Sequence, residues 1–531
     1  MTRGCVGALV ALALTAGLAL RLARLDVRPM HHDEANQAVK FGALLERGEY
    51  RYDTHDHHGP TLYFLALPSA WLRGQATLAA LDERTLRGVP ALFGAATILL
   101  LPLLSHGIGR TAVAAGAWLM ALSPAMVFYS RMFIQESLFA CFTLAFVIAL
   151  GRAVTASSLS WSALAGVAAG LALATKETSV ILLPAALAAC AIAWWSLGRQ
   201  RAVLAGGRWR QAALVSVAAA LAVAALFYSS FLSSPAGVLE PFKAAGSYLD
   251  RGLDPTNHLH PWHYYISLLA YSSSGGLTWS EGLVLLLAAV GAATGLPRAS
   301  AQSRESSLDD PRDDPEHVEG SRWWARYLAC YVLIAAVIFS AIRYKTPWNL
   351  LPFYAGAFAL AGIGFSTLVH ATQSRAVRVA LTAMLAVGSL HLGWQAWRAS
   401  VTYASDSRNP YVYAQTVPDA VRMATRIQAL AAGHPDGVRM QVSVIAPPHE
   451  QWPLPWYLRA MPNVGYWPTT GDALALQAPV VVASMDQTDA VDSALGDGYV
   501  SEFFGLRPEV LLTLYIERGL WDRFLARTNQ P

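Results

Sequence analysis

The feature that most constrains this fold is a succession of apolar segments that recurs along the chain as far as Trp397. About eleven are long enough, at about 15 to 22 residues each, to be read as membrane-spanning helices. Only 14% of the residues are charged and 54% are hydrophobic, whereas a soluble domain carries about 25% charged residues. The sequence therefore predicts an α-helical polytopic membrane protein. The segments start near Val6, Val89, Ala112, Phe133, Trp161, Ser179, Ala212, Gly282, Tyr327, Trp348 and Val379.

The distribution of arginine predicts the orientation. The loop after the sixth segment carries four arginines and no acid between 199 and 210, and such loops remain on the cytoplasmic side. We therefore expect a cytoplasmic N terminus in the cytoplasmic membrane and a large first external loop over 26–88. Within that loop, Leu62–Leu72 is apolar but too short to cross. The charged, proline-containing segment 297–324 is predicted to be a disordered cytoplasmic loop.

The chain changes character after Trp397. Residues 1–397 form the predicted transmembrane domain, and 398–531 have the composition of a soluble domain. Helical periodicity appears near 420–430, and β-type runs occur at 441–445, 479–483 and near 511–516. Helices interleaved with strands predict a small α/β domain on the extracytoplasmic side.

Composition also limits the chemistry. The four cysteines lie in or beside apolar segments, so a cysteine-based zinc site is excluded by spacing and a disulfide framework is not expected. The formal net charge is only +4, and we expect no nucleic-acid partner. Membrane lipids are the expected surroundings.

Polar motifs recur where the predicted topology places external boundaries. Ionisable groups at such depths normally face a protein interior or a wet cavity. The topology therefore predicts that the motifs converge on one extracytoplasmic site. The motifs are His31-His32-Asp33-Glu34, His55-Asp56-His57-His58, Ser130-Arg131 with Glu136, Lys176-Glu177, His258-Leu259-His260 and Arg343-Tyr344-Lys345.

The carboxylates are the candidate catalytic groups. Asp33 would act as a general base toward an acceptor hydroxyl or amine, and Glu34 and Glu136 would share that role or position a metal. A structural alternative stands beside this interpretation, because an acid at the start of the helix over 35–45 would cap it. Glu136 has the comparable alternative of a surface residue at a helix start.

Four cations are candidates for binding a phosphate on the donor: Arg131, Lys176, Arg343 and Lys345. As a group they would neutralise a phosphate or pyrophosphate leaving group. Taken singly, each has the alternative of extending toward lipid headgroups.

Histidines and aromatic residues make up the predicted cavity and acceptor site. These are His31, His32, His57, His58, His258, His260, Trp456 and Tyr457. Clustered histidines favour hydrogen bonding in a polar cavity, and no cofactor is required by the pattern. A divalent metal held by His57 and His58 is the alternative.

Several of these motifs together resemble the GT-C glycosyltransferases, the class that includes protein O-mannosyltransferases and lipid A aminoarabinose transferases. The resemblance rests on the acidic pair after the first span, Ser130-Arg131 with Glu136, the Lys176-Glu177-Thr178 turn and the stretch 345–352. More narrowly, His31 to Ala35, 57–60 and Trp452 to Arg459 are similar to the flippase-activity-associated family linked to archaeal N-glycosylation.

The resemblance implies hexosyl or pentosyl transfer from a polyprenyl-phosphate sugar on the outer face. Asp33 would be the base, Arg131 and Lys345 would hold the lipid phosphate, and Glu34 and Glu136 would support them. The acceptor, a protein or a glycan, stays open. The alternative function is that of a non-catalytic partner of lipid-linked oligosaccharide translocation, which would need only the cations. A secondary transporter fits less well, because the charges gather at one face and no inverted repeat is found.

Overall fold

The computed structural model describes residues 2–52, 58–196, 208–241, 258–296, 315–471 and 473–528. The chain divides into two compact units. Unit 1 comprises 1–25, 50–66 and 87–402, and unit 2 comprises 26–49, 67–86 and 403–531. The domain boundary expected at 397/398 thus lies close to the division at 402/403. Two stretches of the expected first external loop, 26–49 and 67–86, belong to the same unit as the C-terminal residues.

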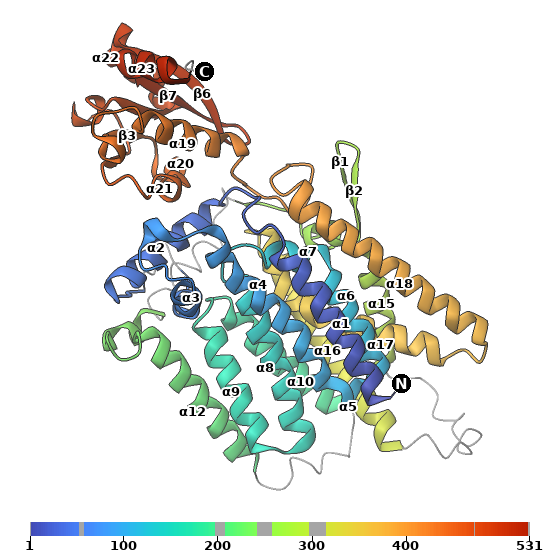
Figure 1. Cartoon of the computed structure of the whole chain (residues 1–531). Coiled ribbons are helices and arrows are strands. Elements are labelled where there is room, and N and C mark those ends of the chain that lie inside the picture. Colours follow the sequence, from blue (N-terminus) through green and yellow to red (C-terminus); the bar gives the residue numbers. More distant parts are fainter. Residues whose placement is uncertain are drawn as a thin grey trace. The chain divides into compact units, whose positions relative to one another are not determined.

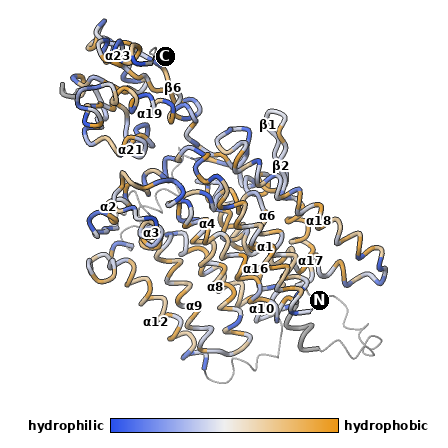
Figure 2. The backbone as a smooth tube through the Cα atoms, viewed as in Figure 1, coloured by the Kyte–Doolittle hydropathy of each residue, from blue (hydrophilic) through white to orange (hydrophobic). Residues whose placement is uncertain are grey.

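Unit 1 is a bundle of apolar helices (Figure 1). Its longer helices are α1 (Arg3–Leu22), α4 (Glu83–Leu100), α6 (Arg110–Leu122), α8 (Glu136–Ala156), α9 (Leu159–Leu173), α10 (Ser179–Ser196), α12 (Trp209–Tyr228), α15 (Gly282–Thr294), α16 (Pro315–Ala341), α17 (Leu351–His370) and α18 (Arg375–Trp397). Figure 2 shows the hydrophobic character of these helices along much of their length.

Shorter elements connect the bundle helices. They are α3 (Thr61–Leu72), α5 (Ser105–Ile108), α7 (Pro124–Tyr129), α14 (Tyr264–Ala270), the hairpin strands β1 (Ser272–Ser274) and β2 (Leu277–Trp279), and 3-10 turns over Leu101–Leu104, Pro235–Leu239 and Pro347–Leu350. A π-helical segment, Arg398–Thr402, follows α18.

Seven helices in the described residues are long and apolar enough to cross a membrane, and five apolar helices are shorter. Each of the eleven expected spans corresponds to one of these twelve helices. The remaining one, α3, is the segment expected to be too short. The chain is therefore a multi-pass, mainly helical membrane protein, as predicted. Its orientation stays a prediction.

Helix α17 lies at the centre of unit 1, where every residue from Leu351 to Phe365 is buried. It packs against α6 and α15. A Cβ atom at Gly362 would lie 2.1 Å from the carbonyl oxygen of Ala112, and one at Gly364 would lie 2.0 Å from that of Leu287. Only glycine allows these backbones to approach so closely, which is how small residues pack helices in membranes.

Unit 2 contains a five-stranded sheet in the order β4-β3-β5-β7-β6. Strands β3 (Val442–Ile445), β4 (Val464–Trp467) and β5 (Val480–Ser484) are parallel, whereas β7 (Val510–Glu517) is antiparallel to β5 and β6 (Tyr499–Arg507). The helices are α2 (His32–Arg47), α19 (Pro418–Ala431), α20 (Pro448–Gln451), α21 (Leu454–Tyr457), α22 (Thr488–Leu495) and α23 (Arg518–Thr528), with 3-10 turns over Leu78–Ala80, Gly437–Arg439, Ala473–Leu476, Met485–Gln487 and Gly496–Gly498. The small α/β domain predicted from the sequence is confirmed.

The core of unit 2 follows from amphipathic patterning. Helix α19 buries Met423, Ile427 and Leu430, which lie at helical spacing, in the same apolar cluster as Val442 and Leu514 of the sheet. Of the segment expected to be a disordered loop, 297–314 lie outside the described residues. The remainder, from Pro315 onward, is the start of α16.

Candidate functional site

The short turn between α9 and α10 is the polar centre of unit 1. Lys176 in this turn donates to a carboxylate oxygen of Glu136, with 2.6 Å between nitrogen and oxygen, and to the side-chain oxygen of Asn349 at 2.9 Å. The side chains of Lys176 and Glu136 are only 7% and 3% exposed. Glu136 is the first residue of α8, where a carboxylate also complements the helix dipole. Two predicted site residues from separate motifs are thus brought into one buried ion pair.

The next residue in the turn, Glu177, extends the network toward the first loop. It accepts hydrogen bonds from His58 and Tyr52, both at 2.7 Å. Burial opposes ionisation of Glu177, but the charge and hydrogen bond of His58 and the hydroxyl of Tyr52 outweigh it and lower its pKa. A Cβ atom at Gly59 would lie 2.3 Å from the carbonyl oxygen of Ala174, so the glycine lets the loop lie directly on the turn.

The Nδ1 atom of His58 is hydrogen-bonded to the carboxylate of Glu177. Within the described residues, no group of three or more histidine, cysteine, aspartate or glutamate side chains is arranged to hold a metal ion. His57, the other candidate ligand, lies outside the described residues. A divalent metal stays an open prediction.

A second cluster joins two motifs that are far apart in the sequence. The backbone N–H of Lys345 donates to the carbonyl oxygen of His258 at 3.0 Å, and Leu259 pairs with Tyr344 in an antiparallel bridge. The ring of His258 lies edge-on to Tyr344, with 4.8 Å between the ring centroids. His260 stacks on Tyr264 with centroids 4.0 Å apart. The structure thus brings the 258–260 and 343–345 motifs into contact, and their sharing of a binding site stays a prediction.

The ammonium of Lys345 is the most unusual charge in this cluster. Lys345 is only 2% exposed, and its Nζ donates to the carbonyl oxygens of Ile342 and His260. Among the described residues, no carboxylate lies within ion-pair distance of it. Burial, together with the positive charge of Arg343, lowers its pKa. Lys345 is thus a buried cation that is bound by two neutral carbonyl groups and, within the described residues, by no carboxylate.

The two clusters are connected through residues 345–349. Asn349, which contacts Lys176, donates its backbone N–H to the carbonyl oxygen of Thr346 at 3.2 Å. The hydroxyl of Tyr265 donates to the same carbonyl at 3.3 Å. The turn after α9, the start of α8 and the stretch after α16 therefore form one continuous polar region in unit 1.

Arg131 has a different environment from the one expected. Its guanidinium donates to the carbonyl oxygens at the end of α1 and just beyond it, at 2.6 to 3.1 Å, and to that of Ser400 at 3.4 Å. These carbonyls have no helical partner, so a guanidinium there closes the helix. These contacts hold the end of α1, and the binding of a phosphate by Arg131 stays a prediction. The α1 carbonyls belong to Leu20, Arg21, Ala23 and Arg24.

The acidic motif lies in unit 2, at the start of α2. His31 is the N-cap residue: its Nδ1 accepts from the N–H of Asp33 at 3.1 Å, while Glu34 accepts from the N–H of His31 at 3.1 Å. This reciprocal arrangement is a capping box with histidine in the place of serine or threonine. Because Nδ1 accepts, the proton of a neutral ring lies on Nε2, which is 3.1 Å from the carbonyl oxygen of Tyr413.

The two acids of this motif therefore differ in environment. Glu34 is fully buried, closes the capping box and lies 3.8 Å from the guanidinium of Arg28. The side chain of Asp33 is 43% exposed and lies 3.7 Å from the ring of His31. The capping alternative considered for this motif is the observed role of Glu34. Asp33 is the carboxylate that a substrate could reach.

His32 contacts the C-terminal part of unit 2. Its ring centroid lies 6.0 Å from that of Trp452, and its Nδ1 lies 3.5 Å from the guanidinium of Arg507. Burial lowers the pKa of Arg507, while Glu450 and Asp33 oppose this effect. Arg507 is a charged neighbour of Asp33, and no motif in the sequence indicated it.

The polar atoms of Trp456 and Tyr457 bind residues of the first loop, and the place of these two side chains in an acceptor site stays a prediction. The indole of the fully buried Trp456 donates to Glu83 at 2.9 Å, and the hydroxyl of Tyr457 accepts from the N–H of Met30 at 2.7 Å. Arg459 donates to the carbonyl oxygen of Leu81 at 2.6 Å.

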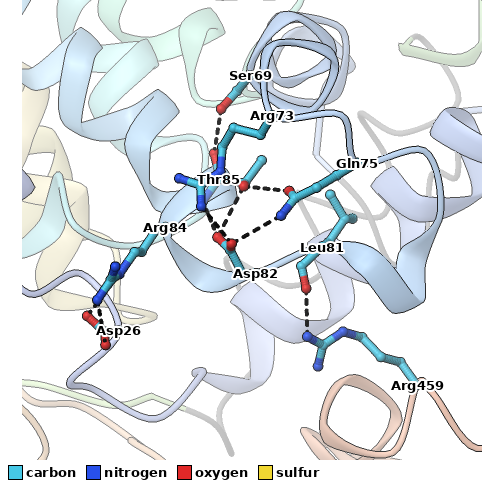
Figure 3. A network of polar contacts seen from close by, with 9 residues as sticks. All are labelled: Asp26, Ser69, Arg73, Gln75, Leu81, Asp82, Arg84, Thr85 and Arg459. Atoms are coloured by element: carbon cyan, nitrogen blue, oxygen red, sulfur yellow. Dashed lines mark hydrogen bonds and ion pairs between the residues drawn. The ribbon is translucent and has the colours of Figure 1, made fainter.

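Figure 3 shows that the last of these contacts lies beside a network around Asp82. Asp82 accepts from Arg73 at 2.8 Å and from Gln75 at 3.1 Å. It also accepts from the N–H of Thr85 at 2.8 Å. Burial of Asp82 is outweighed by these hydrogen bonds and by the charge of Arg73, so its pKa is lowered. The aromatic stretch after Trp452 is thus anchored on a segment that is itself fixed by polar contacts.

The predicted site residues fall into two groups. Unit 1 brings together Glu136 and Lys176, with His58 bound to the neighbouring Glu177, and separately Lys345 with His258 and His260. Unit 2 contains Asp33, Glu34, His31, His32, Trp456 and Tyr457. Convergence of the two groups on one site stays a prediction. Asn349, Tyr413 and Arg507 were not among the expected site residues, although Asn349 lies within the stretch 345–352.

Comparison with known proteins identifies the fold. Residues 67–228 match the dolichyl-phosphate-mannose-protein mannosyltransferase family, which is less than half of the chain. No curated protein matches the sequence at a significant level.

Solved structures match over nearly the whole chain. ArnT from Cupriavidus metallidurans, solved bound to undecaprenyl phosphate, is 17% identical with a TM-score of 0.61, covering 98% of this chain and 99% of that one. The archaeal oligosaccharyltransferase AglB from Archaeoglobus fulgidus, in complex with an inhibitory peptide and a dolichol-phosphate, is 14% identical with a TM-score of 0.54, covering 94% and 74%. The chain therefore has the fold shared by these membrane proteins, as the GT-C resemblance implied.

Proposed function

We propose that this protein is a membrane glycosyltransferase that transfers a sugar from a polyprenyl-phosphate-linked donor to an acceptor on the extracytoplasmic face of the cytoplasmic membrane. The observation that carries the proposal is Lys345, a buried ammonium with carbonyl partners and no carboxylate among the described residues. A phosphate anion supplies the missing charge. The fold supports the same conclusion, since the ArnT structure of matching fold holds undecaprenyl phosphate.

On the donor side, Lys345 and Arg343 bind the lipid phosphate. Arg343 is two residues from Lys345, and its positive charge contributes to lowering the pKa of Lys345. An anion bound between the two side chains offsets their mutual repulsion and also the cost of burying the charge of Lys345. Lys176 is already neutralised by Glu136. Its role in this proposal is to fix Asn349, and through it the segment that carries Lys345.

On the acceptor side, Asp33 is the general base. It removes the proton from the acceptor hydroxyl or amine, the acceptor oxygen or nitrogen forms a bond to the anomeric carbon, and the bond from that carbon to the phosphate oxygen breaks. Polyprenyl phosphate leaves with the electron pair, and the cations of the donor site stabilise its charge. Glu34 supports Asp33 by closing the α2 cap. The transferred sugar is a hexose or a pentose.

The test compares variants of the two proposed groups in membranes supplied with radiolabelled polyprenyl-phosphate sugars. We expect Asp33→Asn to abolish transfer while undecaprenyl phosphate still binds. Lys345→Met should weaken that binding, and Lys345→Arg, which keeps the charge, should retain more of it. Asp489→Asn, at an exposed acid of unit 2, is the matched control.

Two outcomes would contradict the proposal. Unchanged transfer by Asp33→Asn would remove Asp33 as the base. Binding of undecaprenyl phosphate by the unmodified protein without any sugar transfer would instead favour a non-catalytic partner of lipid-linked oligosaccharide translocation.

A further inference from the structure

Unit 2 contains a cleft that none of the roles above uses. It measures about 570 Å³ and lies between the segment Asp26–Pro29 and one side of α19, with Glu83 and Tyr457 completing the wall. This volume is within the range of about 300 to 1,000 Å³ that ligand sites occupy. All of its lining residues belong to the same compact unit.

The helix side of the cleft has a defined pattern. Val421, Thr425 and Ala429 line it at intervals of four residues, which places them in a row along one face of α19. The row is made of small side chains, and Thr425 and Ala429 are exposed. Arg422 and Arg426, each one position further along, carry guanidinium groups along the edge of the row. The floor is therefore mainly apolar, and the guanidinium groups beside it, which pair with Asp419 and Glu502, keep further N–H donors.

The opposite wall carries charges of both signs. Asp26, Arg28 and Glu83 line it, and the ring of Tyr457 is part of the same wall. These groups are held in place: Asp26 pairs with Arg84 at 3.1 Å, as Figure 3 also shows, and Glu83 accepts from Trp456. Guanidinium and carboxylate groups beside a mainly apolar floor, with one aromatic residue in the wall, offer donors and acceptors around the edge of a ligand and apolar contact to one of its faces.

A saccharide has the complementary chemistry. The faces of a pyranose ring are apolar C–H surfaces, and its hydroxyls project around the edge and both donate and accept. Common peptide sites are an open strand edge, a hydrophobic groove or an aromatic-lined groove, whereas this cleft is bounded by a helix and a loop and has one aromatic residue and several charged residues in its lining. The observations thus favour a glycan over a peptide.

The cleft is also tied to the proposed base by the chain itself. Pro29 lines the cleft and precedes Asp33 by four residues, so their Cα atoms are at most about 14 Å apart. The wall is fixed immediately before the α2 cap, because Gln415 donates to the carbonyl oxygen of Pro29 at 2.9 Å and Met30 donates to Tyr457 at 2.7 Å. A ligand in the cleft therefore lies within the length of a few sugar units of Asp33.

From these observations we infer that the cleft between Asp26–Pro29 and α19 is a saccharide-binding subsite for the part of a glycan acceptor remote from the reacting group. The inference rests on the proposed transferase function for its link to Asp33. Binding of a saccharide in the cleft is measurable without any transfer.

The test uses the full-length protein in lipid nanodiscs, probed with an array of neutral and uronic-acid-containing oligosaccharides and, in parallel, with an array of octapeptides. Thr425→Trp and Ala429→Trp each place an indole on the cleft floor at an exposed position. Ala432→Trp places the same side chain at an exposed position of the same helix end that does not line the cleft. Binding of undecaprenyl phosphate reports that each variant is folded.

We expect the unmodified protein to bind one or more oligosaccharides, both filled variants to bind them at least tenfold more weakly, and Ala432→Trp to bind as the unmodified protein does. Undecaprenyl phosphate binding should stay unchanged throughout. The inference fails if no oligosaccharide binds at millimolar concentration, if the filled variants bind normally, or if only peptides bind. It also fails if both filled variants lose undecaprenyl phosphate, because the cleft then serves the fold.

The two proposals fail in different ways. If the transferase proposal is wrong, sugar transfer is absent while cleft-dependent saccharide binding is unaffected. If the subsite is wrong and the transferase proposal is right, the filled variants transfer sugar with an unchanged KM for the acceptor.

Discussion

The buried pair between Lys176 and Glu136 allows a quantitative prediction. Replacing Lys176 with methionine keeps most of the volume but leaves a carboxylate that is 3% exposed without the ammonium 2.6 Å away. Breaking a buried pair in this way costs about 3 to 5 kcal/mol. The substitution also removes the donor to Asn349, and the lost hydrogen bond to this half-buried side chain costs about 1 kcal/mol more. We expect Lys176→Met to destabilise the protein by at least about 4 kcal/mol.

Glu136→Gln should cost less. The amide oxygen of glutamine still accepts from the ammonium, and Lys176 keeps its bond to Asn349 at 2.9 Å. What is lost is the charge neutralisation of a buried cation. The double variant carries neither charge, so its cost should be well below the sum of the two single costs, and a coupling of about 1 to 3 kcal/mol is expected.

The assay is reversible unfolding by sodium dodecyl sulfate in mixed micelles, monitored by tryptophan fluorescence, for the unmodified protein, both single variants and the double variant. Additive costs would refute the argument, because they would mean that the two side chains do not interact energetically in the folded protein. Harmless single substitutions would refute it as well. Loss of undecaprenyl phosphate binding by Lys176→Met at full stability would instead support direct phosphate contact by Lys176.

Three further outcomes are expected. The pKa of Lys345 lies below its ordinary value of 10.5, so affinity for undecaprenyl phosphate should fall as pH rises through that lowered value, measured between pH 7 and 10, and Lys345→Arg should bind with no such fall. Because the pKa of Glu177 is lowered below 4.5, the stability it contributes is present above that pH and lost as pH falls through the lowered value. Acid unfolding of Glu177→Gln should therefore be less steep than that of the unmodified protein. His31→Ala removes the N-cap acceptor of α2, which costs about 1 kcal/mol, so amide hydrogen exchange in the first turn of α2 should become faster. His31→Asn keeps a capping acceptor, so exchange in that turn should be slower than in His31→Ala.

The sequence predicted the helical membrane class and the C-terminal α/β domain because the spacing of hydrophobic residues marks the helices and strands of both. Strands β3, β5 and β7 and helix α19 match the expected runs closely. Strand β6 was missed: its residues are mostly half-buried at the edge of the sheet, so the apolar alternation that marks a strand is weak. The short helices α6 and α15, of 13 residues each, show why a count of spans depends on more than apolar length.

The sequence could not predict with which residue each polar side chain forms its hydrogen bond or ion pair. Lys176 and Glu136 were placed at one boundary, yet the first was assigned to a phosphate and the second to catalysis, because spacing along the chain does not reveal an ion pair between residues 40 positions apart. Arg131 shows the same difficulty, since the free carbonyls at the end of a helix are invisible in a sequence. Asp26–Glu49 joined the C-terminal unit through contacts such as that of Met30 with Tyr457, which no local pattern encodes.

Adjacent charged residues in this protein divide their roles, and helix geometry explains why. Successive residues at a helix start project about 100° apart, so when one acid turns inward to close a cap the next cannot share its environment. Glu34 is fully buried in the capping box and Asp33 is 43% exposed. The same separation occurs in the turn at 176–177, where Lys176 contacts Glu136 and Glu177 contacts His58. At the start of α2, Glu34 is thus the residue that holds Asp33 in position, and a variant at Glu34 should act on chemistry only through Asp33.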